Sequence, residues 1–301
     1  MIIKNNSEFL YLFEAIMTNP NGDPDQENRP RMDNETKTLL VSDVRRKRDI
    51  RDFLFHKGYD IFVNTLNDKK VEMKKMFNAV KEKYEISNND DEQTIIDVIL
   101  NNLIDIRLFG SAMAVEGVTK TFTGPVQLSW GYSLHPVDII KSNSIVTIMN
   151  EDSSTFGKMY KVHYALVAYH GSINKFAANK TKMTELDRDI FRRSLVQSMM
   201  NNITHSKQGQ IPSLYLEIVY DENFDGYLGD LRRFIDVDTD KTTIRKMEDI
   251  KISFDRLSSV IKDMKKNGYI KDVFIWESPY ITQFSNLPEG TVFDLLETIQ
   301  K

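Results

Sequence analysis

Basic side chains are concentrated between residues 29 and 57 of this 301-residue chain. Nine basic and five acidic residues give this stretch a net charge of +4, whereas the whole chain carries −4. A local group of cations can bind phosphate groups even on a protein that is acidic overall. The basic residues are Arg29, Arg31, Lys37, Arg45, Arg46, Lys47, Arg48, Arg51 and Lys57. This region is therefore the first candidate for contact with a polyanion.

Most of these cations belong to one predicted helix. Ser42 is a suitable N-cap, the helix is expected to run to about Lys57, and Gly58 suits the position just past its end. Free backbone N–H groups and the helix dipole favour anions near a helix start. We expect the first two turns to hold phosphate groups well.

The helical spacing places the cations on two flanks, with Arg45 and Arg48 on one and Lys47 and Arg51 on the other. The alternative is a solvated helix whose charges pair with each other one turn apart. Pairs of this kind would be Asp49 with Arg45 and Asp52 with Arg48.

A polar loop precedes this helix and follows a predicted buried strand, Glu8 to Met17. Between Asn19 and Arg31 it carries amides, carboxylates and two guanidinium groups. Amides and guanidinium groups can bridge sugar and phosphate groups, whereas the glycine and acidic residues do not have the spacing of a calcium-binding EF-hand loop. An ordinary connection rich in Asx turns is the alternative interpretation.

Two later segments have residue types that suit nucleic-acid contact. Residues 123–131 carry Gln127 and Trp130 between glycines, as in a base-contacting surface or a projecting hairpin. Trp130 can equally fill a core. Residues 204–210 carry Lys207 and Gln208 between a predicted helix and a predicted strand, and can grip a backbone or form a plain loop.

The composition excludes several kinds of chemistry. The chain has no cysteine, so disulfides, thiolate nucleophiles and cysteine-ligated metals are impossible. The five histidines lack metal-site spacing, and the glycine-rich phosphate loops and the GxSxG motif are absent. No apolar run is long enough to span a membrane. We expect a cytoplasmic protein that is not an enzyme, with no cofactor, no metal and no membrane partner.

The order of predicted elements indicates an α+β fold. Strands are predicted at Tyr59–Leu66, Tyr160–His170 and Leu214–Tyr220, and a capping box at Thr184 opens a helix that runs to about Asn202. If residues 67–158, which include two amphipathic helices, are an insertion, the remainder has the β-α-β, β-α-β order of a ferredoxin-like fold. The tail is expected to add a helix near 254–267, a strand at 273–276 and a final helix from Val292.

Several motifs occur together in one order along residues 8 to 220. They closely resemble those of the backbone subunit of type I CRISPR Cascade complexes, the Cas7 family, and the match is closest to its type I-B branch. The motifs are Asn19-Pro-Asn-Gly-Asp-Pro-Asp25, Arg29-Pro-Arg-Met-Asp33, Val41-Ser-Asp-Val-Arg45, Ile106-Arg-Leu-Phe-Gly-Ser-Ala-Met113, Thr123-Gly-Pro-Val-Gln-Leu-Ser-Trp130, Ser133-Leu-His-Pro136 and His205-Ser-Lys-Gln-Gly-Gln210.

This resemblance implies a modified RNA-recognition-motif palm with helical fingers and a hairpin thumb. The palm with its C-terminal extension would comprise residues 1–66 and 159–301, and the fingers and thumb residues 67–158, with the thumb between Val115 and His135. Such a subunit polymerises head to tail along a CRISPR guide RNA (crRNA), beside other Cascade subunits. It presents the guide for pairing with target DNA in antiviral defence and does not cut.

The resemblance also assigns RNA contacts to residues of this chain. No aromatic pair of the usual RNA-recognition-motif type occurs on the strands, which favours gripping of the RNA backbone over base stacking on the sheet. The expected RNA-binding residues are Asn19, Asn21, Arg29, Arg31, Ser42, Arg45, Lys47, Arg48, Arg51, Ser111, Gln127, Trp130, His135, Lys207 and Gln208.

Two alternative functions remain open. In the related type III backbone subunits a loop aspartate cleaves target RNA with a divalent metal, and Asp33 is the candidate here. Asp23 and Asp25 lie in the same loop, where solvated turns are the expected role for all three acids. The other alternative is a protein-only scaffold whose Arg and Lys residues pair with acidic partner surfaces.

Overall fold

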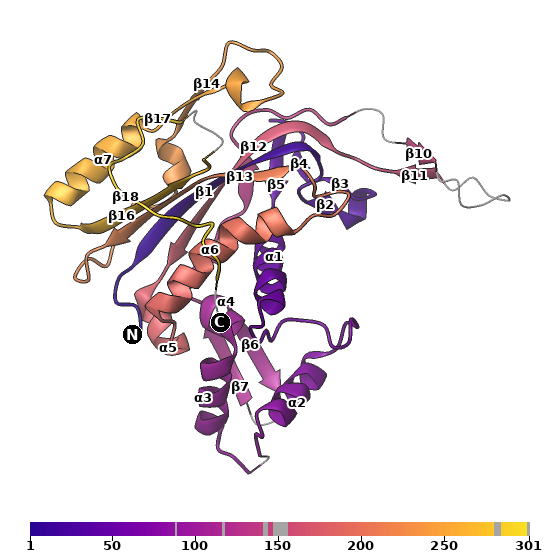
Figure 1. Cartoon of the computed structure of the whole chain (residues 1–301), viewed down its shortest axis with the longest axis vertical. Coiled ribbons are helices and arrows are strands. Elements are labelled where there is room, and N and C mark those ends of the chain that lie inside the picture. The colour runs from indigo at the N-terminus through magenta and orange to yellow at the C-terminus, as the bar shows by residue number, and fades with distance from the viewer. Residues whose placement is uncertain (88, 116–117, 141–143, 147–155, 280–283, 300–301) are drawn as a thin grey trace.

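The computed structural model describes the chain except residues 88, 116–117, 141–143, 147–155, 280–283 and 300–301. Among the described residues, nine strands form one sheet in the order β18-β16-β13-β1-β12-β9-β5-β4, with β8 also paired to β12. At its centre, β1 (Ser7–Thr18) pairs antiparallel with both β12 (Val162–Ile173) and β13 (Gln210–Tyr220). The three predicted strands are therefore confirmed, and they lie side by side (Figure 1).

Strand β1 is apolar on both faces because both faces are covered. Side chains alternate between the faces of a strand. Phe9, Tyr11 and Phe13 belong to one buried cluster, and Leu10 and Leu12 belong to another. A strand buried on both sides shows a nearly continuous apolar sequence, which explains why the sequence indicates this strand so clearly.

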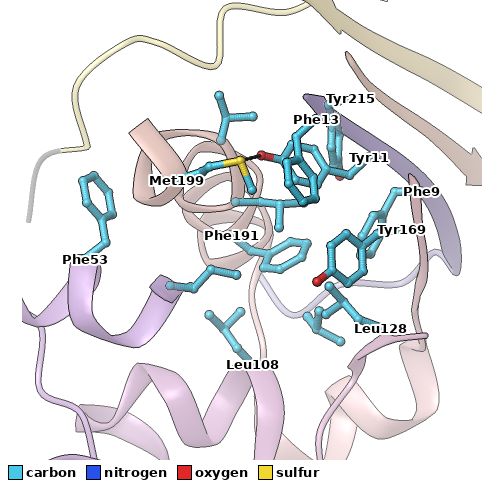
Figure 2. Packing of buried hydrophobic residues seen from close by; sticks show 14 of the residues in the cluster. Phe9, Tyr11, Phe13, Phe53, Leu108, Leu128, Tyr169, Phe191, Met199 and Tyr215 are labelled. Atoms are coloured by element: carbon cyan, nitrogen blue, oxygen red, sulfur yellow. Dashed lines mark hydrogen bonds between the residues drawn. The ribbon is translucent and has the colours of Figure 1, made fainter. Parts of the chain in front are cut away.

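Two helices cover the first face of the sheet. They are α1 (Asp43–His56) and α6 (Glu185–Asn201), and Thr184 forms the predicted capping box. Figure 2 shows the aromatic residues of β1 packed against α6, where the Phe9 and Phe191 rings are 5.4 Å apart, edge to face. The packing of two helices on one face fixes the start of α1 near the end of β1.

C-terminal elements cover the second face. The 3-10 turn Leu231–Phe234, strand β15 (Lys251–Ser253) and helix α7 (Asp255–Lys266) pack their apolar residues against Leu10 and Leu12. Strand β16 (Ile270–Glu277) then extends the sheet beside β13. The face that an open sheet would offer to a ligand is thus closed along β1 (Figure 1).

Buried residues between Phe62 and Phe122 form a second core, which lies below the sheet in Figure 1. Its helices α2 (Met73–Lys83) and α3 (Glu92–Asn102) confirm the two predicted amphipathic helices. A short helix, α4 (Ile104–Phe109), leads into the hairpin of β6 (Gly110–Val115) and β7 (Val118–Thr123).

The remaining elements are short. A hairpin of β10 (Ser144–Val146) and β11 (Phe156–Lys158) extends away from the body in Figure 1. None of the described helices offers a stretch long and apolar enough to cross a membrane. The other elements are β2 (Gly22–Asp23), the 3-10 turn Pro24–Gln26, β3 (Arg29–Pro30), β4 (Met32–Asp33), β5 (Thr38–Val41), β8 (Val126–Leu128), β9 (Gly131–Ser133), α5 (Lys175–Thr181), β14 (Asp236–Asp238), the 3-10 turn Met247–Asp249, β17 (Phe284–Ser285) and β18 (Thr291–Val292).

The predicted strand Tyr59–Leu66 is wrong. Instead of joining a ladder, the backbone N–H groups of Phe62 and Val63 donate to the buried carboxylate of Asp105, at 2.9 and 3.0 Å. The position beside β12 is taken by β8 and β9, and β5 pairs with the outer side of β9.

The predicted final helix from Val292 is also wrong. Side chains of α6 bind the carbonyl groups of this segment: Gln197 donates to the carbonyls of Leu295 and Glu297, and Arg193 to that of Asp294. The segment therefore lies along α6 in a non-helical conformation.

Candidate nucleic-acid interface

The polar loop after β1 is hydrogen-bonded to the start of α1. Ser42 caps the helix as predicted, because its hydroxyl accepts from the N–H of Arg45 at 3.3 Å. The N–H of Ser42 in turn donates to the side-chain oxygen of Asn21 at 2.8 Å. Asn21 is thus held at the helix start, where free N–H groups and the dipole favour anions.

Lys207 joins a third segment to the same place. Its ammonium donates to the carbonyl oxygens of Asn19 and Pro20, each at 2.6 Å. Burial, together with the neighbouring Arg45 guanidinium, lowers the pKa of Lys207 to about 7. Five predicted residues therefore meet where β1 ends, and we call this group the β1-end cluster: Asn19, Asn21, Ser42, Arg45 and Lys207.

Trp130 lies beside this cluster. Val41, the last residue of β5, pairs with Gly131, the first residue of β9. Ser42 directly follows Val41 and Trp130 directly precedes Gly131, so these two residues lie side by side just beyond the paired strands. The Trp130 side chain is 46% exposed, and its carbonyl accepts from Arg232 at 2.7 Å. It is therefore not the core residue of the alternative interpretation, and its ring is accessible for stacking.

Three partly exposed cations of α1 are paired within the helix. The pairs are Arg45 with Asp49 at 2.7 Å, Lys47 with Asp43 at 3.0 Å and Arg48 with Asp52 at 3.0 Å. The alternative of intrahelical pairs is thus confirmed for Asp49 with Arg45 and for Asp52 with Arg48. A phosphate at this helix would have to compete with these carboxylates. The most exposed pair, Arg48 with Asp52, contributes only about 0–1 kcal/mol, whereas Asp49 is buried.

Arg51 lies at the contact between α1 and the second core. Its Nε is 3.1 Å from the carboxylate of Asp105, which is fully buried, and its guanidinium lies 4.9 Å from the centre of the Phe109 ring. The same carboxylate fixes the backbone after α1. Arg51 therefore positions the segments around it.

His135 is buried. Its Nε2 accepts from the N–H of Leu166 at 3.1 Å, its ring stacks on Tyr164, and burial lowers its pKa. These contacts fix the ring as a part of the core that holds the connection after β9 against β12.

Three further predicted residues have separate positions. Gln208 is exposed beside Lys207, whereas Ser111 lies on β6 in the second core's hairpin. Gln127 pairs with Ser172 of β12, and Ser172 pairs on its other side with Glu8, near the start of β1. At about 3.3 Å per residue, this position is roughly 30 Å from the end of β1. Ser111 and Gln127 are thus not brought to the β1-end cluster.

Arg29 and Arg31 each contact an acidic residue of their own loop. Arg31 lies 3.3 Å from Asp23. Arg29 stacks over the ring of Tyr160, and both approach Glu27, which also binds Lys158. Sequence reasoning missed Lys158 and Tyr160, because more than a hundred residues separate them from the loop and no local spacing connects the two segments.

Asp33 accepts hydrogen bonds from its own turn. Its carboxylate accepts from the N–H groups of Glu35 and Thr36, at 3.0 and 3.4 Å. The hydrogen bond from the Thr36 hydroxyl, and then those from the two N–H groups, lower the pKa of Asp33. Within the part of the chain that the structure describes, no three His, Asp or Glu side chains gather in a way that would hold a metal ion.

Comparison with known proteins gives one consistent result. The family model described as CRISPR-associated protein Cas7 matches residues 5–255. CRISPR-associated protein Cas7 of Haloferax volcanii is 24% identical over 287 residues, which cover 87% of this chain and 84% of that protein. The residues matched by the family model include the central strands β1, β12 and β13, the β1-end cluster and the second core.

Two solved structures have the same fold. One chain, from a CRISPR RNA-guided surveillance complex described as pre-nicking, aligns with a TM-score of 0.51 at 11% identity, covering 96% of both chains. Another, from a CRISPR RNA-guided surveillance complex, aligns with a TM-score of 0.50 at 13% identity, covering 92% of this chain and 90% of that chain. With the family model matched from residue 5 to residue 255, this chain belongs to the Cas7 family.

Proposed function

We propose that this chain is a non-catalytic, crRNA-binding backbone subunit of a type I Cascade surveillance complex, of the I-B branch, in the cytoplasm. Copies of the chain would assemble head to tail along the guide, beside other Cascade subunits, and present it for pairing with target DNA in antiviral defence. The observation that carries this proposal is the Cas7 family match over residues 5–255, which includes every residue of the β1-end cluster.

We interpret the central sheet as the modified RNA-recognition-motif palm. This interpretation is supported by the strand order β13-β1-β12 and by α1 and α6 on one face, as expected for a ferredoxin-like palm. Residues 1–66 and 159–301 would form the palm, and 67–158 the fingers and thumb. We propose the β10–β11 hairpin as the thumb rather than the range Val115–His135, because β8 and β9 of that range pair with the central sheet.

The covered sheet supports backbone gripping. Bases cannot stack on the faces of β1, since apolar clusters lie on both sides. The β1-end cluster instead offers an ammonium group, a guanidinium group and amides, which are groups that bind ribose and phosphate without reading bases. Trp130 supplies one aromatic face beside them, on which any base can stack.

The predicted contact residues divide into two groups by their surroundings. Those at this end of the sheet, which are exposed or partly exposed except for the buried Asn19, remain our proposed RNA contacts, together with Gln127 and Ser111 elsewhere. We propose that Arg51 and His135, which are held by buried partners, position the site instead. The proposed contacts at this end are Asn19, Asn21, Arg29, Arg31, Ser42, Arg45, Lys47, Arg48, Trp130, Lys207 and Gln208.

The decisive experiment is a salt titration of RNA affinity. The full chain should bind single-stranded RNA of mixed sequence with a negative slope of log affinity against log salt. Replacing Arg45 and Lys207 together by Gln should weaken binding and reduce the magnitude of the slope by about 0.7 for each phosphate that the protein no longer neutralises. Replacing Lys262 and Lys266 of α7 by Gln is the control, because it removes two basic side chains from the helix that covers the opposite face of the sheet.

Unchanged affinity and slope in the Arg45 and Lys207 variant would contradict the proposal. Absence of co-purifying RNA, together with no binding by the wild-type chain, would favour a protein-only scaffold.

We also infer that Asp33 does not cleave RNA, since its carboxylate is already engaged by its own turn. Incubating the crRNA-loaded chain with complementary RNA and Mg²⁺ or Mn²⁺ should leave that RNA intact. Cleavage that disappears in Asp33→Ala would show a metal-dependent endoribonuclease of the type III kind.

A further inference from the structure

The carboxylate of Glu27 is surrounded by groups that bind anions. The Lys158 ammonium donates to its two oxygens at 3.0 and 3.3 Å, and the Tyr160 hydroxyl donates to one of them at 2.8 Å. The Arg29 guanidinium lies 3.6 Å from the same oxygen. We call these four residues the Glu27 cluster. Two cations and one hydroxyl thus converge on a single negative charge.

The buried side chain of Tyr160 holds one side of this cluster in place. Its side chain is almost fully buried, at 6% exposure, yet its hydroxyl reaches the carboxylate. Arg29 lies over the Tyr160 ring at 4.7 Å and also donates to the hydroxyl at 3.2 Å. The donors are therefore arranged by a buried ring rather than by flexible side chains alone.

The cluster joins two elements of the proposed RNA-binding surface. Glu27 and Arg29 belong to the loop whose other end, at Asn19 and Asn21, enters the β1-end cluster. Lys158 is the last residue of β11, at the base of the hairpin that extends from the body in Figure 1. Whatever anion these donors hold is therefore in contact with both the loop and the hairpin.

The chemistry of the donors suits a phosphodiester as well as the carboxylate they now hold. A phosphodiester carries one negative charge shared by two free oxygens, as a carboxylate does, and both accept charge-assisted hydrogen bonds. The Glu27, Arg29 and Lys158 side chains are 54%, 51% and 53% exposed. Exposed ion pairs contribute little to stability, so an RNA phosphate that also binds the β1-end cluster can replace Glu27 at small cost.

We propose that Glu27 occupies a phosphodiester-binding site, and that a phosphate of the bound RNA displaces its carboxylate from Arg29, Lys158 and Tyr160. This inference rests on the proposed RNA-binding function. The displacement exchanges one anion for another at the same donors, so no covalent bond is made or broken. Glu27 would then compete with RNA within the same molecule. Removing the Glu27 carboxylate should therefore strengthen RNA binding more than removing another carboxylate of the same loop.

The test compares Glu27→Gln with Asp25→Asn, using full-length protein and a single-stranded RNA of mixed sequence. Both variants remove one negative charge from the same exposed loop, but Asp25 lies outside the Glu27 cluster. We expect Glu27→Gln to bind RNA about fivefold more tightly than Asp25→Asn, the effect of releasing one exposed pair. Lys158→Gln and Tyr160→Phe should each bind RNA more weakly than the wild type.

The salt dependence gives a second readout. In Glu27→Gln the freed cations hold a solution anion that the RNA phosphate must release, so the slope of log affinity against log salt should become steeper than in Asp25→Asn. Equal affinities and slopes for Glu27→Gln and Asp25→Asn, with the wild type still binding RNA, would overturn this inference alone. If neither the wild type nor any variant binds RNA, both this inference and the proposed function are wrong.

Discussion

The guanidinium of Arg46 and the carboxylate of Asp49 lie 2.7 Å apart inside the interface between α1 and α6. Arg46 also donates to the carbonyl of Leu195 at 2.7 Å and to the hydroxyl of Ser198 at 3.0 Å, and its side chain is almost fully buried. One member of the basic run therefore joins the two helices that cover the sheet, and the run cannot be treated as a uniform cationic surface.

Replacing Arg46 should destabilise the fold. Arg46→Met leaves the buried carboxylate of Asp49 with only the partly exposed Arg45 as its cation, and it leaves the Leu195 carbonyl and the Ser198 hydroxyl without their donor. We therefore expect the free energy of unfolding to fall by about 3 kcal/mol. Urea unfolding followed by circular dichroism measures this loss. Lys47→Met, one residue along, breaks only a partly exposed pair and should cost less than about 1 kcal/mol. A similar loss in both variants would contradict the role given to Arg46.

RNA affinity should depend on pH through Lys207. With a pKa lowered to about 7 by burial and by Arg45, Lys207 loses its charge as the pH rises through that value. Because only the ammonium attracts phosphate, wild-type affinity should fall up to about tenfold between pH values of roughly 6 and 8.5. Lys207→Gln should show weaker binding without this pH dependence. An equal pH dependence in both proteins would assign the titration to another group.

The lowered pKa of Lys207 also predicts how the stability of the RNA-free protein changes with pH. The unfolded chain keeps Lys207 protonated up to a pKa of about 10.4, whereas the folded chain releases the proton near 7. The unfolded state then binds more protons between these values, so stability should rise with pH from about 7 to 10. Urea midpoints measured across this range should rise more steeply for the wild type than for Lys207→Gln. Parallel curves for the two proteins would contradict the lowered pKa.

Trp130 should contribute base stacking. Trp130→Ala is expected to weaken single-stranded RNA binding by about 1–3 kcal/mol, with little dependence on base identity. Fluorescence anisotropy with oligonucleotides of different sequence measures this. Phe176→Ala is the control, because Phe176 on α5 is also about half exposed but lies away from the β1-end cluster. Loss of affinity in both variants, or in neither, would argue against stacking at Trp130.

The sequence correctly predicted the helices and strands whose deciding interactions are local. Ser42 and Thr184 bind the first turns of their own helices, so both helix starts are readable from the sequence. The strand Ser7–Thr18 is readable because burial on both faces leaves it apolar throughout. In each case the partners that decide the structure are either close in sequence or general apolar surface.

Predictions failed where distant polar groups decide the backbone. The carboxylate of Asp105 takes the N–H groups of Phe62 and Val63, and Gln197 takes carbonyl groups of the C-terminal segment, so neither segment forms the predicted element. In the candidate nucleic-acid interface, too, residues that are distant in the sequence could not be predicted. The sequence identified Arg29 but gave no sign that Lys158, in a segment 131 residues beyond Glu27, would complete the cluster.

The central position of β1 has a consequence for synthesis of the protein. Its neighbours β12 and β13 begin more than 140 residues after β1 ends, so no sheet partner exists when β1 leaves the ribosome. At translation rates of about 5–20 residues per second, this apolar strand waits on the order of ten seconds or longer in the nascent chain. A strand that is buried on both faces in the folded protein is thus exposed in the nascent chain, where it needs protection by chaperones.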